Sequence, residues 1–194
     1  MSQNKSYEIQ GIDLSDDHYT VEQGLIRSSK FKAMDKAGNV VLRTKQKRFK
    51  LKEEFPFVDA NDNAVFTVKA DQIRDVAGNY TLTDDQTGEP VVILDNDYSF
   101  LQDTWTIRDA ETEAKIATIE SQGALYTILR NVVPYGNFIP HEFEIMDANG
   151  THVGSIEGQW SLKDRYDITI DDASNVPKEA IIAAAMVIDA IQGN

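Results

Sequence analysis

The sequence predicts a mainly β protein, a closed antiparallel barrel of about twelve strands around a buried hydrophobic C-terminal α-helix. Three observations predict this fold. Residues 180–191 read AIIAAAMVIDAI and offer no polar face, so a helix there must be buried on every side. Short alternating or β-branched runs fill nearly all of the preceding chain. Turn sequences that begin with Asp separate these runs at the spacing of tight hairpins.

The apolar C-terminal segment is predicted to be helical over about residues 177–191. Pro177 and Glu179 suit a first helical turn, and Ser174 or Asn175 can cap it. Its apolar stretch would be about 18 Å long, whereas a bilayer core needs about 20 apolar residues. The helix is therefore expected in a protein core rather than in a membrane.

The strands are predicted from runs of alternating polarity or β-branched residues. The clear candidates are Leu25 to Met34, Val40 to Gln46, Ala64 to Ala70, Asn79 to Thr83, Val91 to Leu94, Thr104 to Asp109, Ala114 to Ser121, Leu125 to Asn131, Glu142 to Met146, Thr151 to Trp160 and Tyr166 to Ile170. Shorter strands are expected at Tyr7 to Ile12, Tyr19 to Gln23 and Phe55 to Val58. The turns place Asp near the start and usually Gly or Asn where positive φ is needed, so neighbouring strands are expected to be antiparallel.

The buried helix and the strand count together favour closure of the sheet. Side chains alone fill an eight-stranded barrel, and a helix with its side chains is about 10 to 12 Å across, so a sheet that encloses one needs more strands. A two-layer sandwich with a packed helix is the alternative, but it would leave one helix face in water. No linker of biased composition divides the chain, which favours a single domain over residues 1–194.

Composition limits the classes of function. The net charge of -13 creates a field that repels nucleic acid, and the absence of cysteine removes disulfides and thiolate chemistry. Neither a signal peptide nor a stretch long enough to span a membrane is found, so a cytoplasmic protein is expected. The acidic surface also suggests a halophilic, salt-adapted protein; a melting temperature that did not rise in molar KCl would refute that hypothesis.

Positive charge is concentrated in one run, which is the candidate ligand-binding site. Residues 1–52 have a formal balance of +5 and residues 53–194 of -18. The candidate residues are Arg43, Lys45, Lys47, Arg48, Lys50 and Lys52. At strand spacing they would form two adjacent cationic faces suited to a phosphate-bearing headgroup on an anionic lipid surface. The alternative is an edge hairpin charged against aggregation, or cations paired with surrounding carboxylates.

Other patterns give no positive support for an enzyme or a cofactor. The segment 59–63 resembles the opening of a calcium loop, but Ala64 and Ala70 stand where that loop needs Gly and Glu, so a hairpin turn is predicted. His18, His141 and His152 show no metal spacing, and no catalytic motif is present. No metal, cofactor or catalytic residue is therefore expected. Asp189, within the apolar helix, should need a cationic partner or an exposed position at the barrel mouth.

Three segments resemble the LURP-one-related family, which is grouped with phospholipid scramblases and the Tubby C-terminal domain. They are WSLKDRYDITIDD at 160–172, AAAMVIDAIQ at 183–192 and QKRFKLKEEFPFVDANDN at 46–63. The resemblance implies a twelve-stranded barrel around a hydrophobic helix. Through Tubby-like domains the resemblance implies phosphoinositide binding, and through scramblases it implies action at a membrane with calcium. The chain lacks the Pro-rich N-terminus and the acyl-accepting cysteines of scramblases, so lipid scrambling is not expected.

The sequence thus supports two hypotheses about function. The first is a non-enzymatic barrel module, cytoplasmic or peripheral to a membrane, that binds an anionic lipid headgroup or another phosphorylated ligand through residues 43–52. The alternative is a protein-interaction or structural module whose basic face meets an acidic protein partner. An enzyme with a site at the barrel mouth is the least supported class.

Overall fold

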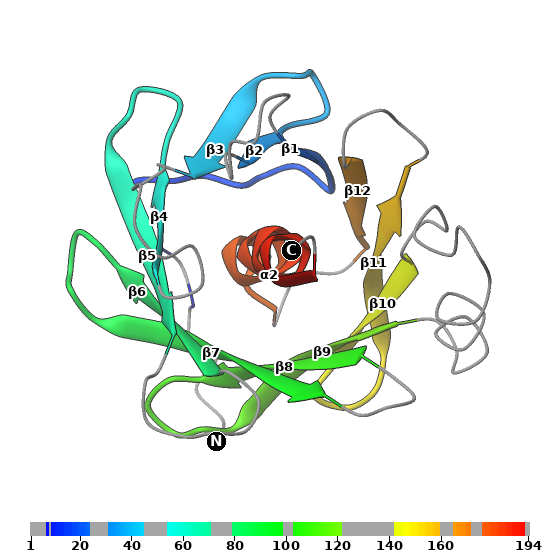
Figure 1. Cartoon of the computed structure of the whole chain (residues 1–194). Helices are drawn as coiled ribbons and strands as arrows, with labels where there is room; N and C mark the ends of the chain where they lie inside the picture. Colours follow the sequence, from blue (N-terminus) through cyan, green and yellow to red (C-terminus); the bar gives the residue numbers. More distant parts are fainter. Residues whose placement is uncertain are drawn as a thin grey trace.

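The computed structural model describes residues 7, 9–23, 31–44, 54–70, 79–98, 103–121, 142–159, 165–171 and 176–192. Twelve strands form a closed barrel around one helix (Figure 1). The strands are β1 (His18–Gln23), β2 (Phe31–Met34), β3 (Val40–Thr44), β4 (Glu54–Val58), β5 (Ala64–Ala70), β6 (Asn79–Asp84), β7 (Pro90–Tyr98), β8 (Asp103–Asp109), β9 (Lys115–Ser121), β10 (Glu142–Asp147), β11 (His152–Gly158) and β12 (Arg165–Ile170). The helix is α2 (Lys178–Gln192). The predicted fold class is confirmed.

The barrel closes by a simple rule. Each strand pairs antiparallel with its neighbours in the sequence, and β1 pairs with β12 to complete the circle. In that last pair Val21 lies opposite Tyr166, and Tyr19 lies opposite Ile168. Closure leaves no sheet edge within the ring, which removes the unpaired backbone groups that make open sheets prone to association.

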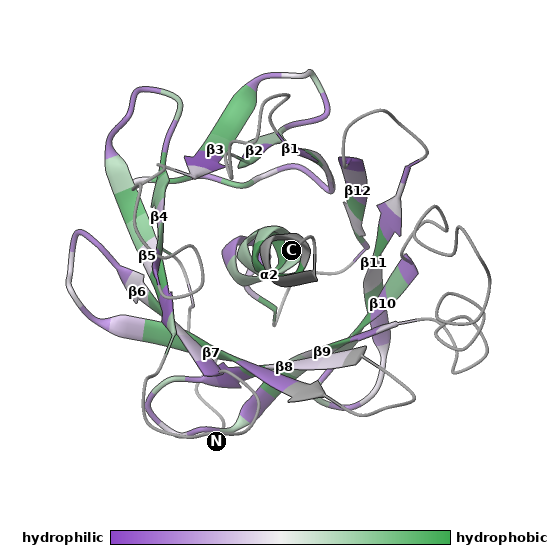
Figure 2. Cartoon of the chain, in the orientation of Figure 1, coloured by the Kyte–Doolittle hydropathy of each residue, from purple (hydrophilic) through white to green (hydrophobic). Residues whose placement is uncertain are grey.

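Strand residues alternate between the barrel interior and its outer face. In β6, for example, Tyr80, Leu82 and Asp84 are buried, whereas Thr81 and Thr83 are half-buried. This period of two places one row of apolar side chains from each strand on the inner face. Figure 2 shows the result as apolar strand segments around an apolar helix, with hydrophilic residues at the turns.

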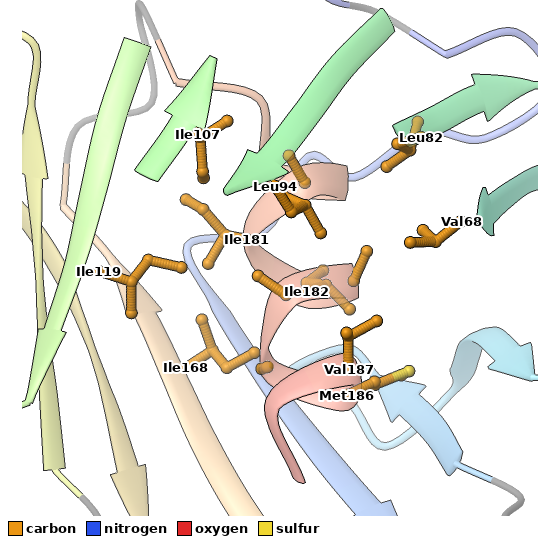
Figure 3. Close-up of a cluster of buried hydrophobic side chains, with 14 of the residues drawn as sticks. Val68, Leu82, Leu94, Ile107, Ile119, Ile168, Ile181, Ile182, Met186 and Val187 are labelled. Atoms are coloured by element: carbon orange, nitrogen blue, oxygen red, sulfur yellow. The ribbon is translucent and has the colours of Figure 1, made fainter. Parts of the chain in front are cut away.

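The interior is filled by α2. Every residue from Ala180 to Ile188 is at most 5% exposed, on all sides of the helix. Ile181, Ile182 and Val187 project from it among inner-face side chains of the strands, which include Leu94 and Ile168 (Figure 3). Full burial of one such side chain stabilises the fold by about 1.5–3 kcal/mol. All sides of this apolar helix are therefore kept from water only because the sheet surrounds it.

Most strand predictions agree with the structure to within a few residues. The segment 64–70 agrees at both ends with β5, and β7 is longer than its predicted core of 91–94. The predicted strand over 125–131, and the choice between Ser174 and Asn175 as helix cap, lie outside the described residues. Pro177 precedes α2 rather than lying within it, and its carbonyl accepts a bond from the Ile181 amide.

The strand expected over residues 7–12 is wrong. The described residues of this segment form no strand, and Gln10 and Gly11 lie in a turn in which Gly11 has φ +87°. The Gln10 amide donates to the carboxylate of Asp84 at 2.9 Å rather than to a strand backbone. Ile9 and Leu14 are buried in the core, so the segment's apolar residues cover one end of the barrel without extending the sheet.

Candidate binding site

The two ends of the barrel differ in the connections they carry. One end, the turn rim, holds five short turns at 35–39, 59–63, 84–89, 109–114 and 147–151, together with residues 9–17, Asp171 and residues 176–179 where α2 begins. The opposite end is called the connection rim. There every odd-numbered strand ends and every even-numbered strand begins, as β1 and β2 do. The alternation follows from antiparallel pairing, because every second connection must lie at the same end.

Each turn on the turn rim is organised by the carboxylate of its first Asp. The carboxylate of Asp59 accepts bonds from the backbone amides of Asn61 and Asn63 at 2.8 and 2.9 Å. Asp147 accepts in the same way from Asn149 and Thr151, both at 2.8 Å. Asp35, Asp84 and Asp109 make corresponding bonds in the other three turns. Residues 59–63 thus form a hairpin turn, as predicted.

Negative charge gathers at the turn rim. Its carboxylates are Asp13, Asp16, Asp17, Asp35, Asp59, Asp62, Asp84, Asp85, Glu89, Asp109, Glu111, Glu113, Asp147, Asp171 and Glu179. The described cations there are Lys36, Lys178, Lys115 at the start of β9, and Arg43 and Arg108, whose guanidinium groups contact the turns at 59–63 and 109–114. Counted in the same way by sequence, with the terminal strand residues included, the connection rim carries eleven Lys and Arg against seven Asp and Glu. The net negative charge of the chain is therefore distributed unevenly along the barrel axis.

Arg43 is the one member of the candidate basic run within the described residues. Lys45, Lys47, Arg48, Lys50 and Lys52 lie outside them, in the segment that joins β3 to β4. Arg43 belongs to the outer face, because Leu42 and Thr44 on either side are buried and it is half-buried. The run therefore begins on the outer face of β3, beside the turn at 59–63, and continues in the sequence through the segment that joins β3 to β4.

The guanidinium of Arg43 is held by its own chain. Its Nη2 donates to the carbonyl of Ala60 at 2.9 Å and lies 3.3 Å from the carboxylate of Asp62. Register explains the contact, since Arg43 pairs with Val58, the last residue before this turn. Arg43 therefore fastens β3 to the turn between β4 and β5, an ion pair inside the chain of the kind that the alternative to a ligand site expects.

Neighbouring cations on the outer face are also paired. Lys32, opposite Arg43 in the sheet, lies 3.2 Å from the carboxylate of Glu22. Arg165 lies 3.6 Å from the other oxygen of Glu22. Glu22 on β1 thus contacts a cation on each of the two flanking strands, β2 and β12. The outer face beside Arg43 is therefore close to electrically balanced. Any ligand that needs several unpaired cations must find them elsewhere in the run.

The turn rim is closed by packing around Tyr19. This side chain is 1% exposed, and burial raises the pKa of its hydroxyl to about 12. Beside it, the Lys178 ammonium donates to the carbonyl of Asp16 at 2.5 Å and joins the helix start to the segment before β1. Tyr19 is therefore a neutral part of the core at any ordinary pH.

The remaining candidate groups give no metal centre within the described residues. No cluster of three or more His, Asp or Glu there has the arrangement of a metal site. His152 contacts Glu144 at 2.5 Å and Asp171 at 3.6 Å, and His18 contacts Thr169. His141 and the side chain of Asp189 lie outside the described residues. No helix in the described part of the chain is long and apolar enough to cross a bilayer.

Asn96 is a residue of interest that the sequence patterns did not single out. Asn96 on β7 and Trp105 on β8 are paired across the sheet near the connection rim, and each holds a buried polar atom without a partner. A signal for Asn96 exists in hindsight: it continues the inward series of Val92 and Leu94 at period two, so a polar side chain stands where the pattern places an apolar one.

These features define a class: a closed antiparallel β-barrel whose interior is occupied by its own C-terminal helix. The family model described as LURP-one-related matches residues 40–189, and the chain belongs to that family. A solved structure of an Arabidopsis thaliana protein is similar with a TM-score of 0.57 and 12% identity, over 90% of this chain and 91% of that one, which shows a shared fold. No curated protein matches the chain.

Proposed function

We propose that this chain is a non-enzymatic barrel module of the cytoplasm that binds a phosphate-bearing anionic ligand through residues 43–52. The observation that carries the proposal is the charge separation along the barrel axis. Carboxylates crowd the turn rim, while the segment joining β3 to β4 carries five cations in eight residues, 45–52. An anionic surface would attract the connection rim and repel the turn rim, so the field would orient the barrel end-on.

The filled interior supports a site on the outside of the barrel. Ligand-binding barrels commonly keep a cavity between their strands, but here α2 fills that space with buried apolar side chains. A catalytic site inside the barrel would have to displace this helix. Binding at a rim, by contrast, would use the cations that the sequence places in the segment joining β3 to β4.

Within the proposed site, Arg43 has a positioning role. Its contacts with Ala60 and Asp62 fix the end of β3, from which the basic run continues. The cations that would contact phosphate are Lys45, Lys47, Arg48, Lys50 and Lys52. Near an anionic surface each contributes about 1 kcal/mol, an attraction that weakens as salt shortens the Debye length to about 3 Å at 1 M.

Vesicle flotation tests the proposal directly. The full chain should float with phosphatidylserine-containing vesicles at low salt, stay behind with phosphatidylcholine alone, and lose its binding as salt rises. Lys47→Glu combined with Lys50→Glu should abolish flotation. The matched control, Lys36→Glu with Lys115→Glu, makes the same change of charge on the turn rim and should float like the wild type if the rims act differently.

Two further arms separate the sources of negative charge. Soluble inorganic phosphate at millimolar concentration should compete with vesicles if a phosphate group is the recognised chemistry. Binding to poly-glutamate with no binding to either vesicle would instead favour the protein-interaction module. Equal flotation of the two charge-reversal variants would contradict the assignment to residues 43–52, because net charge alone would then explain binding.

A further inference from the structure

Asn96 and Trp105 form a neighbouring pair on the inner side of the sheet near the connection rim. They are directly opposite each other in the pairing of β7 with β8. Trp105 is 1% exposed, and Asn96 is partly exposed. Directly opposed residues of an antiparallel pair have Cβ atoms about 4.5–5.5 Å apart, so the two side chains share one small volume.

Each side chain holds a buried polar atom that has no hydrogen-bond partner among the residues that the structure describes. On Trp105 it is the indole Nε1, which can only donate, and on Asn96 it is the carbonyl Oδ1, which can only accept. Leaving a buried donor or acceptor unpaired is costly, and native structures rarely tolerate it. One group that both accepts and donates can bridge two such atoms of opposite kind on facing residues, and a hydroxyl is the smallest organic group that does so.

Aromatic rings form an apolar wall beside this pair. The ring of Tyr80 lies 6.0 Å from that of Trp105, and the ring of Phe55 lies 6.3 Å from Tyr80. Tyr80 and Phe55 are each 7% exposed, and burial raises the pKa of the Tyr80 phenol. A mostly apolar and aromatic lining with one donor and one acceptor is the usual composition of a small-molecule site.

We propose that Asn96 and Trp105 bind a hydroxyl group of a polyol ligand at the connection rim. The ligand hydroxyl accepts from the indole N–H of Trp105 and donates to the amide oxygen of Asn96. Tyr80 and Phe55 shield these bonds from water, and the partly exposed Asn96 marks the side from which the ligand enters. This site uses no cation and stands independently of the basic run.

The indole N–H of Trp105 reports on this site directly. In the ¹⁵N-labelled full chain two indole resonances are expected, and Trp105→Phe assigns them, since Trp160 is the other tryptophan. Glycerol and glucose should shift the Trp105 resonance saturably. The matched compound 1,2-dimethoxyethane, which can accept from the indole but cannot donate to Asn96, should bind more weakly and need a higher concentration for the same shift. The compounds are compared on the wild-type chain, and a variant is used only to assign the two resonances.

Variants test the acceptor. Asn96→Leu should weaken the glycerol dissociation constant by about tenfold, the effect of losing one hydrogen bond at a buried site. Asn79→Leu makes the same substitution at an exposed position on the same rim, in β6, and should leave the constant unchanged. A shift that never saturates, an equal response to dimethoxyethane, or equal effects of the two variants would overturn the proposal and leave a bound water as the partner of the pair.

Discussion

Glu113 shows how a single residue can carry strain in an otherwise regular turn. Gly38, Gly88 and Gly150 supply the positive φ that three of the five turns on the turn rim need, whereas Asp62 and Glu113 adopt φ of 68° and 58° in the other two. A residue with a Cβ in this region costs about 1–2 kcal/mol, although Asp tolerates it better through local hydrogen bonds. Glu113 therefore stands at the position where glycine is most clearly preferred.

Replacing Glu113 should stabilise the protein. Glu113→Gly relieves the backbone strain, and the larger freedom of glycine in the unfolded chain offsets part of the gain, so we expect the free energy of unfolding to rise by about 0.5–1 kcal/mol. Urea denaturation measures the change. Glu111→Gly removes the same charge from the same turn at a position without positive φ, and should destabilise. Equal gains from both substitutions would mean that relief of charge repulsion, rather than of strain, is responsible.

The side-chain contacts near the candidate site could be predicted from the sequence only in part. The run from Arg43 to Lys52 is visible in the sequence as a cluster of charge. That Arg43 reaches the carbonyl of Ala60 depends on the register of β3 with β4, which places Val58 opposite it. The unpaired atoms of Asn96 and Trp105 depend likewise on the register of β7 with β8. Local pattern does not determine register between strands, so these contacts could not be predicted.

At the scale of elements, the turns that begin with Asp make the stability of the fold depend on pH. Hydrogen bonds from the Asn39 side chain and from backbone amides lower the pKa of Asp35 below its ordinary value. Asp59 and Asp147 have lowered pKa values for the same reason, with bonds from Asn63 and Thr151 as the leading causes. A carboxyl whose pKa is lower in the folded state stabilises the fold above its unfolded pKa and loses that contribution as pH falls through the folded pKa.

The protein should therefore lose stability in acid through these turns. Its free energy of unfolding should fall as pH drops below about 4, the ordinary pKa of Asp, because the unfolded chain binds protons first. A triple variant with Asp35, Asp59 and Asp147 changed to Asn keeps an acceptor in each turn and should show a flatter pH profile in urea denaturation. Changing Asp13, Asp17 and Asp85 to Asn is the control. Parallel profiles for the triple variant and the wild type would show that the turns are not the source.

Strand and turn elements were predictable from sequence because their signals are local. Asp at the start of a turn and alternation within a strand are both read over a few residues, and they identified β5 to its ends. The segment 7–12 failed because its alternation reflects packing onto the barrel end, with Ile9 buried and the Gln10 amide bound to Asp84. A long-range bond of this kind leaves no trace in local pattern.

For the whole molecule, the closed sheet and the central helix explain each other. A ring of twelve strands needs something wider than side chains at its centre, and a helix without a polar face needs cover on all sides. Strand count and the apolar helix predicted this arrangement from sequence. The separation of charge between the two rims became visible only when antiparallel order assigned each connection to one end.

The central claim is that α2 is the core of the barrel and not an appendage, and removal of the helix tests it most directly. A chain that ends at Pro177 should show no cooperative unfolding transition by calorimetry or near-ultraviolet circular dichroism, because every strand would face an empty interior. Addition of a peptide with residues 178–192 should restore part of the transition. A truncated chain that unfolds cooperatively at the wild-type temperature would contradict the account.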